Sequence, residues 1–151
     1  MRVMIRQRPG GFHYQEGEIS EMIMQIGRFK ALPVDGFVFG LLDETGHIDI
    51  PGTMRLVRAA HPFHVTFHKA IDATPNPVHA VRQLKELGGI STILTSGGAQ
   101  TAIEGAETIR QMLEAAGDDL EIMACGKVTS ENLSRVHDLI GAPAYHGRRI
   151  V

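Results

Sequence analysis

The chain has 151 residues, of which 43% are hydrophobic and 21% are charged, a balance typical of one globular domain with one core. Lys and Arg total 15 against 17 for Asp and Glu, so the formal net charge of -2 gives no electrostatic reason to expect a nucleic acid or membrane partner. The single cysteine, Cys125, excludes an internal disulfide. The sequence also lacks a membrane-length apolar run and a signal-peptide pattern, and we therefore predict a cytoplasmic protein.

Six short β-prone segments recur along the chain. Their starts are roughly 25 to 35 residues apart, which is the spacing of parallel strands joined by helices. The segments are 3–5, 36–40, 64–68, 92–94, 120–124 and 144–146. No linker or low-complexity stretch interrupts this alternation, so we predict a single α/β domain over residues 1–151 with about six strands and five helices.

The segments between the strands carry apolar residues at a period near 3.6 together with helix start signals. Asn76-Pro77 predicts a capped helix over 78–87, and Thr101 with Glu104 predicts a capping box at the start of the next helix. Further helices are expected over 19–29, 51–60 and 130–140. Six strands suit a doubly wound sheet, whereas a (β/α)8 barrel needs eight and normally about 200 residues, so the chain could also lack pieces of a larger fold.

Polar residues follow several of these strands, and the carboxyl ends of parallel strands are where α/β folds bind their ligands. Arg6 and Arg8 follow the first strand. They are two residues apart, so an extended backbone directs both guanidinium groups to one side, where they can clamp a carboxylate or a phosphate. A structural ion pair with Asp43 or Asp72 is an equally weighted alternative.

The third and fourth strands are also followed by polar groups. His68 is either a satisfied polar residue inside a barrel or a proton carrier that Asp72 orients. Ser96, Gly97 and Gly98 offer a hydroxyl and backbone amides to an anion, although a turn between a strand and a helix favours the same residues.

Cys125 follows Met123 by two positions at the end of the fifth strand. Both side chains can therefore face one side and offer a thiolate and a thioether to a soft ion such as Cu(I). The commoner role of such a cysteine is that of a small buried residue, and this alternative stays open.

Several blocks, taken in order, resemble the CutC family. They are Met-Ile-Arg-Gln-Arg-Pro-Gly-Gly at 4–11, Asp-Gly-Phe-Val-Phe-Gly at 35–40, Gly-His-Ile-Asp at 46–49, Val-Thr-Phe-His-Lys-Ala-Ile-Asp at 65–72, Leu-Thr-Ser-Gly-Gly at 94–98 and Ala-Ile-Glu-Gly at 102–105. The similarity runs along essentially the whole chain. It implies a TIM (β/α)8-type barrel, incomplete here because the first two βα units and the terminal helix are lacking, in a cytoplasmic protein of copper homeostasis suspected of binding Cu(I).

Two blocks depart from the pattern of the family. Residues 124–127 read Ala-Cys-Gly-Lys where a Pro-Gly-Gly-Gly-like turn is common, so Lys127 either contacts an anion or fills the pocket. Gly147 stands where some relatives carry cysteine, which removes a soft ligand beside His146. Lys127 and His146 complete the predicted ligand-binding set.

Three functional hypotheses follow. The primary one is a CutC-like protein that handles Cu(I) through Cys125 and Met123, with no assigned reaction. The alternative is an enzyme or receptor for a small anionic metabolite. Its ligand-binding set is Arg6, Arg8, His68, Asp72, Ser96, Gly97, Gly98, Lys127 and His146. The third hypothesis is a homo-oligomer in which unpaired edge strands pair with a second copy.

Overall fold

A computed structural model of the chain describes residues 1–148 and 150. Its strands are β1 (Arg2–Met4), β2 (Gly36–Phe39), β3 (His64–Phe67), β4 (Thr92–Thr95), β5 (Glu121–Ala124) and β6 (Ala144–Tyr145). Its helices are α1 (Glu16–Phe29), α2 (Ile50–Ala60), α3 (Pro77–Leu87), α4 (Ala106–Ala116) and α5 (Leu133–Ile140), and a short 3-10 helix, η1 (Lys69–Ala73), follows β3. The predicted single run of alternating strands and helices is confirmed.

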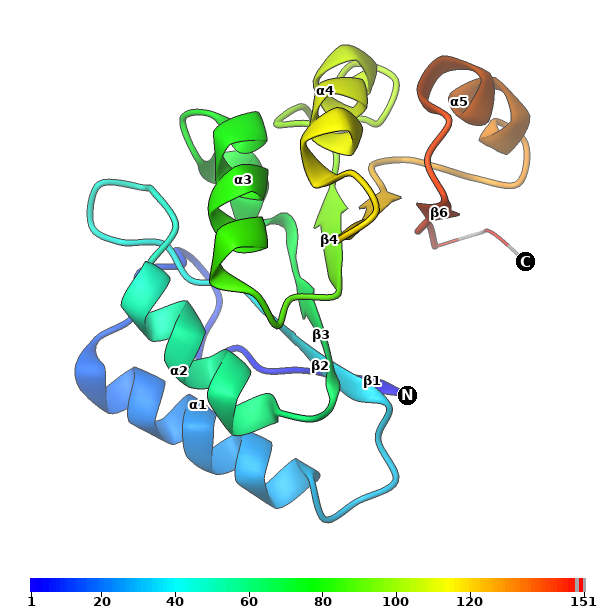
Figure 1. Cartoon of the computed structure of the whole chain (residues 1–151). Coiled ribbons are helices and arrows are strands. Elements are labelled where there is room, and N and C mark those ends of the chain that lie inside the picture. The colour runs from blue at the N-terminus through cyan, green and yellow to red at the C-terminus, as the bar shows by residue number, and fades with distance from the viewer. Residues whose placement is uncertain (149, 151) are drawn as a thin grey trace.

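The six strands form one parallel sheet in the order β1-β2-β3-β4-β5-β6. This order never reverses, so the sheet has no switch point and is not doubly wound. Figure 1 shows the helices following the sheet from α1 and α2 at the lower left to α5 at the upper right. Among the described residues β1 and β6 each pair on one side only. The fold is therefore an incomplete (β/α)8-type barrel.

The core lies between the sheet and its helices. Phe37 and Phe39 of β2 and Phe67 of β3 are fully buried, as are Met22 of α1 and Leu56 of α2. These phenylalanines occupy one phase of their strands, because side chains alternate between the two faces of a sheet. The apolar stripes that predicted the helices supply the other half of the core.

The opposite phase of the strands lines the inner face of the sheet, where Thr66 and Thr92 are buried but several other residues are less so. Met4 is 55% exposed, and Val38, Leu94 and Met123 are half-buried. The sheet is open, and this explains the difference, because in a complete barrel the side chains of all eight strands fill the interior. The predicted homo-oligomer, which would use the open edges, stays a prediction.

The start of α3 is formed as the sequence predicts. The Asn76 Oδ1 atom accepts the backbone N–H of His79 at 3.1 Å, and Pro77 occupies the first helical position. The cap satisfies an N–H that the first turn of the helix cannot pair internally.

The predicted start of the next helix is wrong by four residues, because the observed N-cap is Gly105 and not Thr101. Thr101 Oγ1 accepts the N–H of Glu104 at 3.1 Å, as a cap would, but α4 begins only at Ala106. The turn at 101–105 is tied to the segment after β5, because the N–H of Ala102 donates to the carbonyl of Gly126 at 2.9 Å.

The last helix also begins later than predicted, at Leu133. Before it, Asn132 Oδ1 accepts the N–H of Thr129 at 2.8 Å, and the backbone forms a non-helical turn there. None of the described helices is both long enough and apolar enough to cross a bilayer.

Candidate functional site

The segments that follow the strands meet at one edge of the sheet, because all six strands run in the same direction. Three groups of polar residues lie there. One joins the ends of β1 and β3, the second joins the ends of β3 and β4, and the third follows β5 and β6. The predicted site residues are divided among these groups.

Asp72 is the centre of the second group. Its Oδ1 accepts the hydroxyl of Thr95 and the N–H of Gly98, the latter at 3.0 Å. Its Oδ2 accepts the N–H of Ser96 at 2.9 Å and the ammonium of Lys69 at 3.0 Å. The carboxylate is 10% exposed, so these four donors satisfy it almost without solvent. Asp72 thus ties the end of β3 to the loop after β4.

This network alters the predicted role of the glycine-rich loop. The N–H of Gly98 is used by Asp72, and the N–H of Gly97 donates to Thr95 Oγ1 at 2.9 Å. Ser96 is fully buried and its hydroxyl contacts Lys69 and the carbonyl of Ala99. The amides that were predicted to cradle an anion are therefore already paired inside the protein.

Gly97 has a structural reason to be glycine. Its φ is 72°, and a Cβ atom there would lie 2.4 Å from the carbonyl oxygen of Gly105. The loop after β4 and the turn before α4 are so close here that no side chain fits between them.

His68 belongs to the first group and is 5% exposed. Its Nδ1 accepts the N–H of Ala70 at 3.1 Å, and its ring lies 5.2 Å from that of Phe12. Burial, together with the smaller effect of the nearby charge of Arg6, lowers the pKa of His68 to about 4. Asp72, which was predicted to orient His68, is bonded instead to the loop after β4.

The tautomer of His68 follows from these contacts. A neutral ring whose Nδ1 accepts a hydrogen bond carries its proton on Nε2. That Nε2 is buried and has no hydrogen-bond partner among the described residues. Near neutral pH His68 is therefore a hydrogen-bond donor, whereas the role of proton carrier would need a ring able to take up a proton there.

The two arginines after β1 are held in different ways. The Nε atom of Arg8 lies 2.9 Å from Glu18 Oε2, and its guanidinium lies over the ring of Tyr14. The guanidinium of Arg6 lies 4.9 Å from the ring centroid of Phe12. Arg8 thus braces its own loop against α1, and its acidic partner is neither Asp43 nor Asp72.

The third group surrounds a concave pocket of about 590 Å³, here called the basic pocket. Its lining residues are Lys69, Leu94, Cys125, Gly126, Lys127, Val128, Thr129, His146, Gly147 and Arg148. The predicted residues Cys125, Lys127 and His146 meet here. Arg6, Arg8, His68 and Ser96, which also belong to the predicted ligand-binding set, do not line it.

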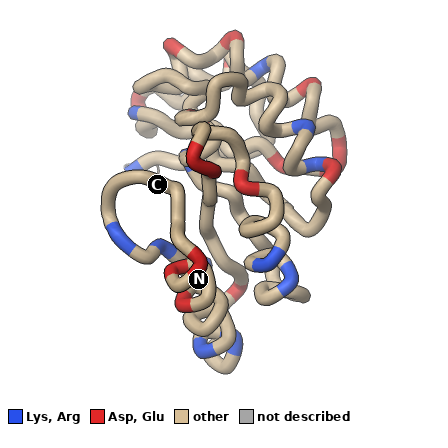
Figure 2. The backbone as a smooth tube through the Cα atoms, turned by 90° about the vertical axis from the view of Figure 1, so that its left-hand side faces the viewer, with Lys and Arg blue, Asp and Glu red and all other residues tan. Residues whose placement is uncertain are grey.

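The basic pocket has an excess of positive charge. Lys69 is neutralised by Asp72, whereas Lys127 and Arg148 make no ion pair within residues 1–148 and 150. No aspartate or glutamate lines the pocket. Along the rest of the backbone, acidic and basic residues are interspersed (Figure 2).

The turn after β5 shapes the pocket wall. Gly126 has a φ of 105° and Lys127 a φ of 53°, a left-handed conformation that lysine rarely adopts. Asn132 Nδ2 donates to the carbonyl of Lys127 at 2.8 Å and fixes the turn. A Cβ atom at Gly126 would lie only 3.0 Å from Ala102 N and Ser96 Cβ, so the turn packs directly on the neighbouring loop.

Cys125 is the only thiol of the chain and is 2% exposed. Burial raises the pKa of this thiol to about 11, and the charge of Lys69 opposes the rise only in part. Met123 lies two residues earlier, within β5, and is half-buried. The part of the chain that the structure describes contains no cluster of three or more His, Cys, Asp or Glu residues suited to a metal ion.

Lys69 and Arg148 line the basic pocket although neither was in the predicted ligand-binding set. Both had a usable signal, because each is a basic residue within two positions of a predicted site residue at the end of a strand. Leu94 had none, since an apolar residue in a strand is expected whether or not it faces a ligand.

Comparison with known proteins places the chain in a family. The model of the CutC family matches residues 1–151. The chain belongs to the CutC family. A CutC protein of Parabacteroides distasonis is 40% identical over 147 residues, and a human protein named copper homeostasis protein cutC homolog is 40% identical over 144 residues.

These matches cover nearly the whole chain but not the whole of the relatives. They include 97% and 95% of the chain, against 60% of the bacterial relative and 52% of the human one. A solved CutC structure from Streptococcus agalactiae superposes with a TM-score of 0.92 at 34% identity, over 99% of this chain and 73% of that one. The chain thus spans about half to three fifths of its curated CutC relatives.

The Asp72 network predicts a large loss of stability in Asp72→Asn. The amide keeps the shape of the carboxylate but loses its charge and turns one acceptor into a donor that faces other donors. We expect the free energy of unfolding to fall by about 2 to 4 kcal/mol, measured by urea denaturation. Asp118→Asn, a control at an exposed aspartate, should change it by less than about 0.5 kcal/mol. Equal losses of stability in the two variants would contradict a structural role for the Asp72 network.

The tautomer of His68 predicts its behaviour with pH. Because its pKa in the folded protein lies at about 4, below the value of about 6.5 in an unfolded chain, the unfolded state takes up the proton first. The stability contributed by His68 is complete above about pH 6.5 and is lost as the pH falls toward 4. NMR should show His68 neutral with Nε2–H from pH 8 to 5, and titrating normally in urea. A folded-state transition near pH 6.5 would disprove this assignment.

Proposed function

We propose that the basic pocket binds a small organic anion and that the chain acts as a receptor or an enzyme for such a compound. The observation that carries this proposal is the excess of positive charge at Lys127 and Arg148 in a concave site without lining carboxylates. Anions are held in such sites because the charge attracts them and the low-dielectric walls strengthen the attraction.

The position and the walls of the pocket support the same conclusion. The pocket lies at the carboxyl ends of the strands, where barrels of this type bind their ligands. Leu94, Val128 and Cys125 add apolar surface, which suits the carbon skeleton of an organic ligand better than a bare inorganic ion. The volume of about 590 Å³ is in the usual range for metabolite sites.

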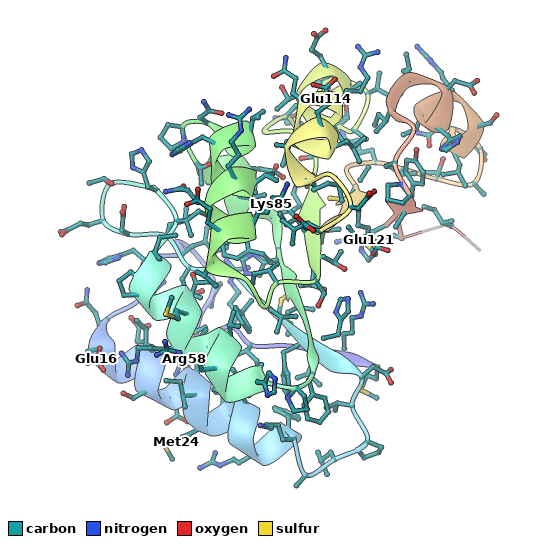
Figure 3. All side chains as sticks on the ribbon, in the orientation of Figure 1. Glu16, Met24, Arg58, Lys85, Glu114 and Glu121 are labelled. Carbon is teal, nitrogen blue, oxygen red and sulfur yellow. The ribbon has the colours of Figure 1, made fainter. Side chains whose placement is uncertain are left out.

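Calorimetric titration of the 151-residue chain with a panel of citrate, D-glycerate and glycerol 3-phosphate tests this proposal. We expect at least one of them to bind, with an affinity that falls as salt is added. Arg148→Gln should weaken binding about tenfold or more, as expected for a lost charge-assisted contact. Arg58→Gln removes the same charge from α2, at a distance from the pocket (Figure 3), and should have no effect. Absence of binding across the panel would disprove the proposal.

A second candidate function is the handling of Cu(I) as cargo. It is favoured by the position of Cys125 on the pocket wall, directly after β5, and by Met123 two residues earlier in the sequence. Thiolate and thioether are the donors that Cu(I) prefers. The human and mouse relatives carry the name copper homeostasis protein cutC homolog, which agrees with this candidate.

Cu(I) binding should depend on pH through the thiol. Because the pKa of Cys125 is about 11, each bound ion must displace a proton, and affinity should rise about tenfold per pH unit between pH 6 and 9. Competition with a chromogenic Cu(I) chelator under argon measures this. Cys125→Ser should abolish binding and Arg6→Ala should not. Unchanged affinity in Cys125→Ser would rule out this site.

A further inference from the structure

The charge balance of the basic pocket discriminates between classes of anion. The Lys69 ammonium is already compensated, because it lies 3.0 Å from Asp72 Oδ2. Lys127 and Arg148 have no such partner in the described part of the chain. A carboxylate would neutralise only one of these two charges. A phosphomonoester carries a charge of about -1.5 to -2 near neutral pH and matches both.

The turn after β5 adds backbone donors at the same place. The N–H of Cys125 donates to the carbonyl of Thr95 at 2.8 Å, and the N–H of Thr129 donates to Asn132 Oδ1 at 2.8 Å. Between them, the N–H groups of Gly126 and Lys127 have no acceptor among the described residues. Successive backbone N–H groups in a turn of this kind form a concavity that binds oxyanions. A phosphate has enough oxygens to accept from both N–H groups and both side chains.

The other lining residues indicate what the phosphate is attached to. Leu94 and Val128 are apolar, and Lys69 lies next to the Ser96 hydroxyl. The pocket of about 590 Å³ is far larger than a phosphate group, which occupies the space of only a few waters of roughly 30 Å³ each. The remaining space fits a carbon skeleton of metabolite size.

We propose that the basic pocket binds the phosphomonoester of a small metabolite. Its phosphate contacts the side chains of Lys127 and Arg148 and the N–H groups of the turn after β5. Its carbon skeleton lies along Leu94 and Val128 toward Lys69. This inference rests on the proposed function, because it names the class of anion that the same pocket takes.

A matched pair of ligands tests the phosphate directly. Glycerol 3-phosphate and D-glycerate share a three-carbon skeleton and differ in the anionic group, and inorganic phosphate serves as the fragment. By calorimetry the ester should bind at least tenfold more tightly than glycerate, and more tightly as the pH rises through about 6, where the second proton of the phosphate is lost. Inorganic phosphate should compete with the ester.

The variant Lys127→Gly tests the site without a risk to folding, because glycine accepts a φ of 53° more easily than lysine does. It should lower the affinity for the ester about tenfold, and Arg148→Gln should do the same. Arg58→Gln should leave this affinity unchanged. In both pocket variants the ratio of the affinities for the ester and for glycerate should become smaller. An unchanged affinity in Lys127→Gly and Arg148→Gln would place the ester elsewhere and overturn the inference.

The remaining outcomes separate the two proposals. Equal affinities for glycerol 3-phosphate and glycerate would overturn the phosphate assignment and leave the anion pocket standing. Binding of none of the anions, inorganic phosphate included, would overturn both. If the protein sediments with vesicles that contain phosphatidic acid but does not bind the soluble ester, the phosphate belongs to a lipid headgroup. That outcome would overturn the assignment of a small metabolite.

Discussion

The carboxylate of Asp72 is the interaction on which the arrangement of the strand ends depends. Through four donors it joins η1 to the loop that follows β4, and it holds Lys69 at the edge of the basic pocket. A buried carboxylate is tolerated only when hydrogen bonds replace its lost hydration, and the backbone N–H groups of Ser96 and Gly98 supply two of them. The loop is therefore shaped around an anion that belongs to the protein itself.

This internal anion decides where an external one can bind. The amides after β4 are occupied, so the loop that looks most like an anion cradle in the sequence has little left to offer a ligand. The turn after β5 keeps its Gly126 and Lys127 N–H groups unpaired among the described residues, and it lies beside cations without partners. The backbone N–H groups that are free to bind an anion therefore lie in the turn after β5 and not in the loop after β4.

The sequence predicts the fold better than the site, for a physical reason. Strand spacing and helical periodicity are local patterns, and the six strands follow from them. The pairing of Arg8 with Glu18 could not be predicted, because Arg8 lies beyond the end of β1 and its partner lies on α1, ten residues further along the chain. The anion clamp of Arg6 and Arg8 stays a prediction. The β4 amides are paired with Asp72, more than twenty residues earlier in the chain, and no local pattern reveals such a partner. Lys127 lines the pocket, and the sequence drew attention to it because it departs from a glycine-rich turn that the family resemblance implies.

The left-handed backbone of Lys127 has an energetic consequence for the whole chain. A residue with a Cβ atom in this conformation costs about 1 kcal/mol or more, and every folded molecule carries that cost whether its pocket is filled or empty. Glycine would relieve the strain but would remove a positive charge. At this turn, selection for a more stable protein and selection for a more cationic pocket therefore act in opposite directions.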